Sequence, residues 1–465
     1  MYPQNIDALS AELKGRFGAS TDFTERRISK QGFTACVYYI RSICDRKYLS
    51  DRIVSPIVKN GGKDFAGGFD SLLQCAALID ATDPDSWVKA IMGGNALVAV
   101  ETDRLYLTVA PADDFSYRSV SEPDSDVTVK GPKAGFTESG EGNVAALRRI
   151  IRHESLRVKQ LFVGELTDTK VFLVYMEGRA DPRVISKLEN RLKNGAACIV
   201  DSGNLELMLS PRGSFFPTLG SSEKVDKVAS KLLSGRVGVV CDGSPFVLTA
   251  PYVFAESIQS AEDYLKPFWY ATFMRFLRFF AFLASLLLPA VFVAAVYHDK
   301  GLVPSVLMDS LMEMEKDIKL SFMAEMLIML TAFEIIREVG VRMPRGVGDA
   351  VGLVASLLVG DATVKAGLAG TSVLIIVAFS ETAGFIVPAL SNSITVLRYI
   401  YLFAAYGGGL YGLLFAFGLT VMALLKKQSF GVGYMVPLYP FSLRGMEDFL
   451  LAIPKKTLGR REKLK

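Results

Sequence analysis

The sequence predicts an α/β soluble N-terminal half made of two related subdomains, followed by an α-helical polytopic membrane domain. Three observations lead to this prediction. The chain has 465 residues, which is too long for one ordinary domain of about 150 residues. Charged residues make up 22% of the chain, yet after residue 267 they give way to long uncharged apolar runs. In the N-terminal half, one succession of strand-like and helix-like segments occurs twice.

The repeated succession defines the two subdomains. Phe33–Ile53 resembles Lys170–Leu192, because each has an apolar strand-like run, a turn, and a helix-like run that starts near an Asp. Gly93–Pro111 resembles Ser234–Pro251, because each alternates apolar residues on either side of a polar turn, as β-hairpins do. The expected limits are 1–120 for subdomain 1, 121–141 for a Gly-rich connector and 142–267 for subdomain 2, which starts with a helix at Asn143–Arg157 and a strand at Lys159–Leu166.

The connector places several glycines ahead of a helix-like run, as phosphate-binding loops do. A P-loop has the pattern GxxxxGK[ST], with Lys directly after the second glycine, whereas Phe136 follows Gly135 here. We therefore expect no cofactor and interpret the segment as a structured connector or a contact between subunits. Asn143 is expected to cap the following helix, and Lys130 and Glu138 to pair with a neighbouring subunit. The residues assigned to this connector or subunit contact are Lys130, Gly131, Pro132, Gly135, Phe136, Glu138 and Asn143.

The sequence indicates neither a catalytic nor a metal site. The five cysteines form no CxxC pair, so we expect reduced thiols in a cytosolic compartment. His153 and His298 are far apart in the chain, which argues against a histidine metal site and against a Ser-His-Asp triad. The net charge of +4 is too small to indicate nucleic-acid binding. The N-terminal segment has no apolar signal core.

Three apolar runs are long enough to cross a bilayer, whose core of about 30 Å needs roughly 20 helical residues. They are Phe279–Tyr297, Ala366–Leu397 and Tyr399–Leu425. Gly346–Lys365 is a weaker fourth span, and Ile318–Ile336, which holds charges, is expected to be a hydrophobic helix that does not span. The expected membrane domain is 268–428, and a basic tail occupies 429–465.

Basic residues set the expected orientation of the membrane domain. Arg275 and Arg278 precede the first apolar run, and the tail is rich in Lys and Arg. The positive-inside rule therefore places both the N-terminal half and the tail in the cytoplasm. Two ends on the same side require an even number of spans, which favours four.

Polar residues within the apolar runs are candidates for function, because ionisable groups there are costly unless they face water or a partner. One interpretation is a cation pathway, and the alternative is salt bridges such as Glu334 with Arg337 or Arg342. Glu381 is the most isolated carboxylate in the sequence. Small residues in the weaker fourth run favour close helix packing or a narrow pore, and Gly407–Gly409 favours a packing or kink point over an ion filter. The candidate pore or intramembrane polar residues are Gly352, Ser356, Gly360, Asp361, Glu381, Glu325 and Glu334.

Several segments also resemble a known family. They are FGASTDFTERRI near the N-terminus, then GPKAGFTESGEGNVAALRRIIRHESLRVK, CDGSPFVLTAP and LTAFEIIREVGVRMPRGVGDAVGLV. In order and content they resemble the A subunits of GerA-type spore germination receptors of endospore-forming bacteria. Two departures are Ser121 and Lys130, which stand where that family often has arginine. These departures leave room for an accessory relative of the stage V sporulation protein AF type.

The resemblance implies a multi-pass protein of the spore inner membrane, a bacterial cell membrane, in contact with lipid. It implies two partners: a B subunit that resembles a transporter and is taken to bind the nutrient germinant, and a C subunit that is a lipoprotein. It also implies that A subunits assemble with themselves into a ring, expected to be a pentamer, that releases cations when nutrient binds. A membrane transporter and a membrane-anchored enzyme are the alternatives from other functional classes.

Overall fold

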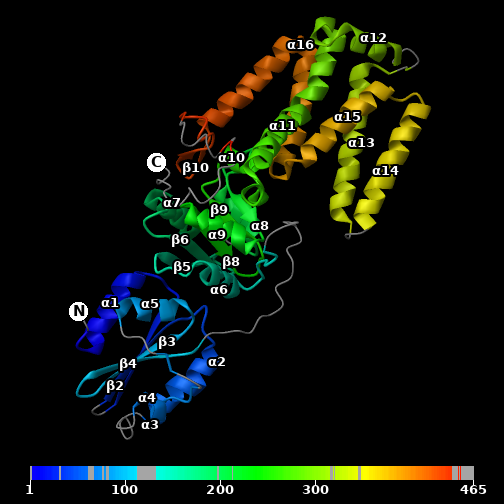
Figure 1. The fold of residues 1–465 in the computed structure, drawn as a ribbon. Coiled ribbons are helices and arrows are strands. Elements are labelled where there is room, and N and C mark those ends of the chain that lie inside the picture. The colour runs from blue at the N-terminus through cyan, green and yellow to red at the C-terminus, as the bar shows by residue number, and fades with distance from the viewer. Residues whose placement is uncertain are drawn as a thin grey trace.

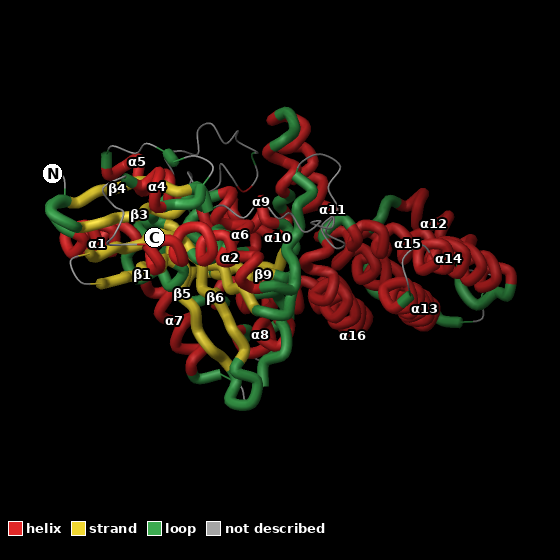
Figure 2. Tube along the Cα trace, turned by 90° about the horizontal axis from the view of Figure 1, so that it is seen from below, coloured by secondary structure: helices red, strands yellow, loops and turns green. Residues whose placement is uncertain are grey.

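The computed structural model describes residues 3–30, 33–60, 68–75, 78–79, 83–112, 132–195, 198–211, 213–314, 318, 320–343, 347–441, 449 and 451. The N-terminal half holds two β-sheets with helices on their faces, and the C-terminal half is helical (Figure 1). Seen from below, the strands of the two sheets lie on one side of the molecule and helices α13 to α15 on the other (Figure 2). The predicted order of a sheet-containing half and a helical half is confirmed at this level.

The first sheet is antiparallel, with the strand order β1-β2-β3-β4. Strand β2 shows why this sheet forms. Successive side chains of a strand point to opposite faces of the sheet, and in β2 the side chains on both faces are buried against helices. Cys36 and Tyr38 pack with α1 and α5, whereas Ala35 and Val37 pack with the helices that follow β2. The elements are α1 (Ile6–Phe17), β1 (Phe23–Lys30), β2 (Phe33–Ile40), α2 (Arg46–Tyr48), a π-helical segment (Leu49–Val54), α3 (Ser55–Asn60), α4 (Phe69–Leu72), α5 (Pro84–Met92), β3 (Ala96–Glu101) and β4 (Leu105–Ala110).

The second sheet is also antiparallel, with the order β5-β6-β8-β9-β7. Its two faces are covered by different helix pairs: α7 and α8 pack on one face, and α6 and α9 on the other. The elements are α6 (Gly140–Ile150), β5 (Leu156–Val163), β6 (Thr169–Met176), α7 (Pro182–Lys193), α8 (Ser202–Leu209), β7 (Gly220–Ser222), α9 (Val225–Leu233), β8 (Val237–Cys241), β9 (Val247–Ala250) and α10 (Phe254–Ile258).

The two sheets share the succession that the sequence repeats. In each, a hairpin leads to a helix whose N-cap is an aspartate, Asp45 in the first and Asp181 in the second. In each, a helix and a second hairpin follow, so that β1-β2-β3-β4 corresponds to β5-β6-β8-β9. The helix expected at Asn143–Arg157 is found at Gly140–Ile150, and the strand expected at Lys159–Leu166 is found at Leu156–Val163. The strand begins earlier because Leu156 and Val158 belong to the core between the sheet and α6.

Contacts between β5 and the segment before β1 join the two sheets. The Thr21 amide donates to the Val158 carbonyl at 2.8 Å, and the Val158 amide donates to Ser20 Oγ at 3.1 Å. Beside them, the buried guanidinium of Arg148 on α6 holds both carboxylate oxygens of Asp22, each at 2.9 Å. A bidentate pair of this kind fixes orientation as well as distance, so it ties the first sheet to the second.

The C-terminal half consists of helices around α11, which packs against both α15 and α16. Of the described helices, α11 and the stretch that ends with α16 are long and apolar enough to cross a membrane. The helices are α11 (Phe268–Tyr297), α12 (Ser305–Met314), α13 (Phe322–Arg342), α14 (Val347–Lys365), α15 (Thr371–Phe385) and α16 (Ser391–Lys426), with 3₁₀ turns at Ala261–Tyr264, Lys300–Leu302 and Pro388–Leu390 and a small hairpin, β10 (Gln428–Ser429) and β11 (Val432–Gly433).

Helix α16 is folded back on itself at Gly409. The backbone there has φ 58° and ψ −144°, a conformation that glycine adopts readily and other residues do not. The rings of Tyr401 and Phe417 lie 6.4 Å apart, whereas a straight helix would separate those positions by about 24 Å. The kink predicted from the glycine triplet is therefore confirmed, but the prediction of one continuous span at Tyr399–Leu425 is wrong.

A second apolar run is also divided. Ala366–Leu397 was expected to be one span, but the structure places α15, a 3₁₀ turn and the start of α16 there. Pro388 explains the division, because proline has no backbone N–H and cannot continue the helix before it. The hydrophobic helix expected at Ile318–Ile336 corresponds to α13, which continues beyond it to Arg342.

Candidate functional site

The connector is tied to the second sheet of its own chain. The Phe136 amide donates to the Glu223 carbonyl at 2.7 Å, and Gly135 forms a β-bridge with Lys224. The Phe136 ring is 5% exposed and packs between the sheet, α6 and α9. Pro132 is exposed just before this bridge. Lys130 and Gly131 lie outside the described residues.

The sequence predicts that Asn143 caps the following helix, and this prediction is wrong. Helix α6 begins earlier, and Ser139 Oγ accepts from the Gly142 amide at 3.2 Å as its N-cap. Asn143 lies within the first turn, where its side chain accepts from the Thr137 amide at 2.8 Å and donates to the Thr137 carbonyl at 2.6 Å. It therefore closes the connector onto the helix. The Glu138 side chain is exposed, and its pairing with another subunit stays a prediction.

Four of the predicted pore residues lie on α14: Gly352, Ser356, Gly360 and Asp361. Gly360 faces α15, because a Cβ there would stand 3.5 Å from Leu374. Asp361 is exposed and pairs with Lys365 at 2.6 Å, one turn along the same helix. Their role in a pore stays a prediction.

Glu325 has a different environment. Its side chain is buried, and Oε2 accepts from the Gly370 amide at 2.8 Å. Gly370 is the N-cap residue of α15, so the carboxylate sits at the positive end of that helix dipole. Glu325 thereby ties the start of α13 to the start of α15.

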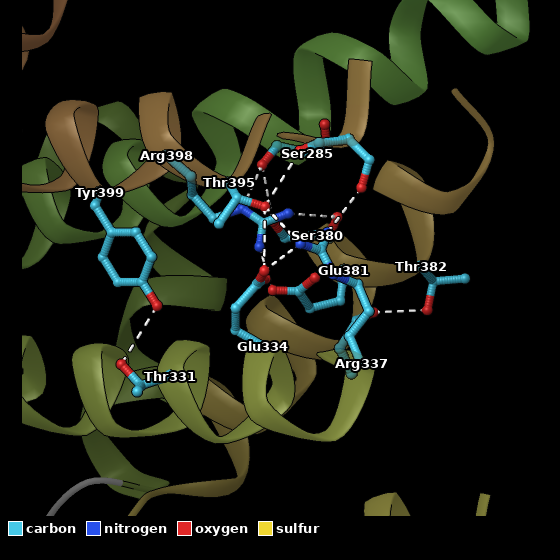
Figure 3. A network of polar contacts seen from close by, with 12 residues as sticks. Ser285, Thr331, Glu334, Arg337, Ser380, Glu381, Thr382, Thr395, Arg398 and Tyr399 are labelled. Atoms are coloured by element: carbon cyan, nitrogen blue, oxygen red, sulfur yellow. Dashed lines mark hydrogen bonds and ion pairs between the residues drawn. The ribbon is translucent and has the colours of Figure 1, made fainter. Parts of the chain in front are cut away.

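The remaining predicted carboxylates belong to one cluster between four helices, which we call the interhelical cluster (Figure 3). It includes two acids and two bases, so its formal charges balance. Its members are Ser285 on α11, Glu334 and Arg337 on α13, Ser380 and Glu381 on α15, and Ser391, Thr395 and Arg398 on α16.

Glu381, the most isolated of the predicted carboxylates along the chain, is paired in the structure. It forms an ion pair with Arg398, and the two side chains are 6% and 3% exposed. Arg398 also donates through Nε to the Ser285 carbonyl at 3.0 Å. Arg398 was not among the predicted site residues, although the sequence could have indicated it, because it is the single charge between two long apolar runs.

Glu334 forms the salt bridge with Arg337 that the sequence offered as one alternative. Arg337 reaches further, donating to Ser391 Oγ at 2.8 Å and to Thr395 Oγ1 at 2.9 Å. Each arginine of the cluster thus connects helices that are distant in sequence. Among the residues that the structure describes, no group of His, Cys, Asp and Glu could hold a metal ion.

The two halves of the molecule meet at the ends of α16. Ser393 Oγ, near its start, donates to the Phe215 carbonyl. Lys427, just after its end, donates to Ser214 Oγ and the Phe216 carbonyl and lies 5.0 Å from the centre of the Tyr434 ring. Burial lowers the pKa of Lys427 to about 8. One loop of the second sheet therefore holds both ends of the folded helix.

Comparison with known proteins finds similarity along almost the whole chain. The family model described as Bacillus/Clostridium GerA spore germination protein matches residues 11–464. Spore germination protein KA of Bacillus subtilis (strain 168) is 34% identical over 455 residues, 96% of this chain and 84% of that protein. The uncharacterized membrane protein YfkQ of the same strain is 31% identical over 439 residues, 92% of this chain and 85% of that protein. The crystal structure of the N-terminal domain of the A subunit of the Bacillus megaterium spore germinant receptor GerK3 is similar with a TM-score of 0.39 and 25% identity, covering 54% of this chain and 95% of that one.

Proposed function

Because this chain belongs to the Bacillus/Clostridium GerA family of spore germination proteins, we propose that it is the A subunit of a spore germinant receptor. The observation that carries this proposal is the extent of the family match, residues 11–464, which takes in both sheets and the helical half. The balanced, paired charges of the interhelical cluster favour a role in assembly and signalling over catalysis.

The proposed receptor subunit crosses the membrane six times, two more than the sequence suggested. The support is the direction of successive helices. The end of α11 meets the start of α13, where Tyr297 Oη accepts from the Met323 amide at 3.1 Å. The end of α11 also meets the fold in α16, where His298 Nε2 lies 2.8 Å from the Tyr406 carbonyl oxygen.

The opposite end of the bundle faces the sheets, where both ends of α16 contact the loop at Ser214–Phe216. Helices α11, α13, α14, α15 and the two arms of α16 then alternate in direction. Six passes keep the N-terminal half and the tail on one side, which the basic residues assign to the cytoplasm. Helix α15 is the shortest pass, since its 15 residues extend over about 22 Å.

The proposed membrane function is cation release through a ring of copies of this chain, with α14 along the path. Two features support α14. Gly352, Ser356 and Gly360 recur every four residues, so they share one face of the helix. Leu357 and Leu358 are 71% and 62% exposed, which leaves an apolar face for a second copy or lipid. Glu325, Glu334 and Glu381 are engaged within the chain, so we assign them to packing.

The proposed partners follow from the family: a transporter-like B subunit that binds the nutrient, and a C lipoprotein. In this scheme the sheets report the state of the B subunit to the membrane helices. The loop at Ser214–Phe216 is the suitable point of transfer, because it contacts both arms of α16.

A second candidate is an accessory germination or sporulation protein. The similarity to YfkQ, which is named only as an uncharacterized membrane protein, leaves room for this role. Ser121 and Lys130, where the family often has arginine, point the same way.

Deletion of the gene in the native spore former tests both candidates. A receptor subunit predicts complete loss of germination with at least one nutrient, restored by the wild-type chain. Germination that still responds to every nutrient but more slowly would favour the accessory role. Unchanged germination would contradict both.

Cation flux tests the membrane function. The chain is purified with its B and C partners, placed in liposomes and supplied with nutrient mixtures while potassium release is recorded. Leu357→Ala on α14 is expected to change the basal leak severalfold. Leu419→Ala on α16, an exposed leucine away from α14, is the matched control. Equal leak from both variants would remove α14 from the path.

A further inference from the structure

Pro289 interrupts the hydrogen bonds of α11 at a buried position. Proline has no backbone N–H, so the carbonyl of the residue four positions earlier loses its partner. That residue is Ser285, and both residues are buried inside the helical half. Its own hydroxyl donates to the Phe282 carbonyl at 2.8 Å and cannot supply the missing bond. A buried carbonyl without a donor is costly, above all in an apolar environment.

Two other helices supply the donors that α11 lacks. Ser380 Oγ on α15 donates to the Ser285 carbonyl oxygen at 2.9 Å, and Arg398 Nε on α16 donates to the same oxygen at 3.0 Å (Figure 3). A carbonyl oxygen has two lone pairs, so these two bonds satisfy it completely. The contacts come from positions 95 and 113 residues away in the chain.

The surroundings of Arg398 fit this arrangement. Glu381, next to Ser380 on α15, neutralises the guanidinium that would otherwise be a buried unpaired charge. Gly384, one turn further along α15, lies beside both groups, since a Cβ there would be at ordinary contact distance, 3.6 Å from Arg398 Nη2 and 3.8 Å from Ser285 Cβ. Helix α15 can therefore lie close to α11 at the level of the break.

We propose that Arg398 and Ser380 are positioning residues that cap the break made by Pro289 in α11, and that Glu381 is the counter-ion of Arg398. The three helices are thereby held at one point. A change in the bend of α11 has to break these bonds, and α11 is the helix that leads directly out of the sheet-containing half. This assignment does not depend on the proposed function, because it concerns only which groups satisfy the Ser285 carbonyl.

If Arg398 and Ser380 cap the break, Pro289→Ala should compensate for the loss of Arg398. Alanine restores the N–H that bonds to Ser285, so the outside donors become unnecessary. The experiment is a double-mutant cycle on the full chain in detergent, with the midpoint of thermal denaturation as the readout. The two changes are Pro289→Ala and the charge-free pair Arg398→Met with Glu381→Gln.

The charge-free pair alone is expected to lower the midpoint by about 5 °C. Adding Pro289→Ala to this variant should recover at least half of the lost midpoint. The rise in midpoint should also be larger than the rise that Pro289→Ala causes in the wild-type chain. A matched control replaces the other ion pair of the cluster, Glu334→Gln with Arg337→Met, where the effect of Pro289→Ala should be additive. If Pro289→Ala gives the same gain in all three backgrounds, the proposal is overturned.

If the variant with the charge-free pair does not fold, a second double-mutant cycle with a smaller substitution gives the same test. Ser380→Ala removes one neutral donor and leaves the ion pair in place. Pro289→Ala should recover its loss of midpoint, whereas the loss from Ser391→Ala, a serine of the cluster that contacts Arg337, should remain. Recovery of both or of neither contradicts the proposal.

Discussion

Arg148 and Arg398, two buried arginines in different halves of the molecule, have different structural roles. Arg148 faces Asp22 with both carboxylate oxygens engaged, and the side chains are 0% and 6% exposed. Arg398 is buried to a similar degree, yet it divides its donors between the Glu381 carboxylate and the carbonyls of Ser285 and Ser380. The first arginine joins two sheets through side chains, whereas the second also bonds a backbone carbonyl that lost its helical donor to Pro289.

The comparison shows why similar ion pairs should respond differently to mutation. In the sheet-containing half, Arg148 bonds to the side chains of Asp22 and Ser20, so removing both charges leaves little unsatisfied. In the helical half, removing both charges leaves the Ser285 carbonyl, four residues before Pro289, with Ser380 as its remaining donor of the two.

Arg148→Met is expected to have the largest effect, destabilising the chain by about 3–5 kcal/mol, because Asp22 remains buried without its partner. Adding Asp22→Asn should recover much of this loss. The fluorescence of Trp87, which is buried between the first sheet and its helices, reports the transition during urea unfolding in detergent. Trp269→Phe in every variant leaves Trp87 as the single tryptophan.

The control for that prediction is Arg46→Met. Arg46 also connects the two sheets, through Glu141, but the side chains are 58% and 32% exposed. Exposed pairs contribute at most about 1 kcal/mol. A loss from Arg46→Met as large as that from Arg148→Met would show that burial is not what gives the Arg148 pair its strength.

Gly409→Ala is expected to cost about 2 kcal/mol, because the side chain meets an unfavourable positive φ. A Cβ there would also approach His298 Cβ to 2.9 Å. The neighbouring Gly408→Ala has open space and serves as the control. Thermal denaturation gives the loss, and a disulfide between cysteines at positions 401 and 417 reports whether α16 is still folded back. Equal stability of the two variants would contradict a tight turn at Gly409.

Lys427 provides the smallest expected effect, which depends on pH. Burial lowers its pKa from 10.5 to about 8, so between these values the unfolded chain binds more protons than the folded chain. Stability from this group therefore rises as pH increases from 8 to 10.5 and is lowest when Lys427 is charged. The solvent that still reaches this side chain limits the effect to about 1 kcal/mol.

Lys427→Met should flatten the dependence of the denaturation midpoint on pH between 8 and 10. Lys426→Met, at the adjacent exposed lysine, should follow the wild-type curve. Parallel curves for wild type and Lys427→Met would mean that the lysine is not desolvated at the junction.

Much of the sheet-containing half followed from the sequence, because strands and short helices leave local patterns. The alternation in Gly93–Pro111 and Ser234–Pro251 identified both hairpins, and Asp45 and Asp181 marked the starts of two helices. The start of α6 was less clear, since Ser139 and Asn143 are both suitable caps by residue type. Only the contacts of Asn143 with Thr137 distinguished them.

The helical half was less predictable, because apolar residues there fit lipid or protein equally well and leave little periodicity. Long runs at Ala366–Leu397 and Tyr399–Leu425 indicated helices but concealed where the chain turns. Pro388 and Gly409 were visible in the sequence, yet each is compatible with a kink as well as with a reversal. The contact of Tyr401 with Phe417 decided between these at Gly409.

By itself, then, the sequence determined the two fold classes, their order, the repeated strand and helix succession and the membership of the GerA family. These depend on local composition, periodicity and motif order, which the chain carries along its length. Only the tertiary structure decided the fold of α16 and the partners of Glu381 and Arg398. The reason is physical: a carbonyl freed by proline can be satisfied by any donor that packing brings within 3 Å, and the donors here come from helices about a hundred residues away.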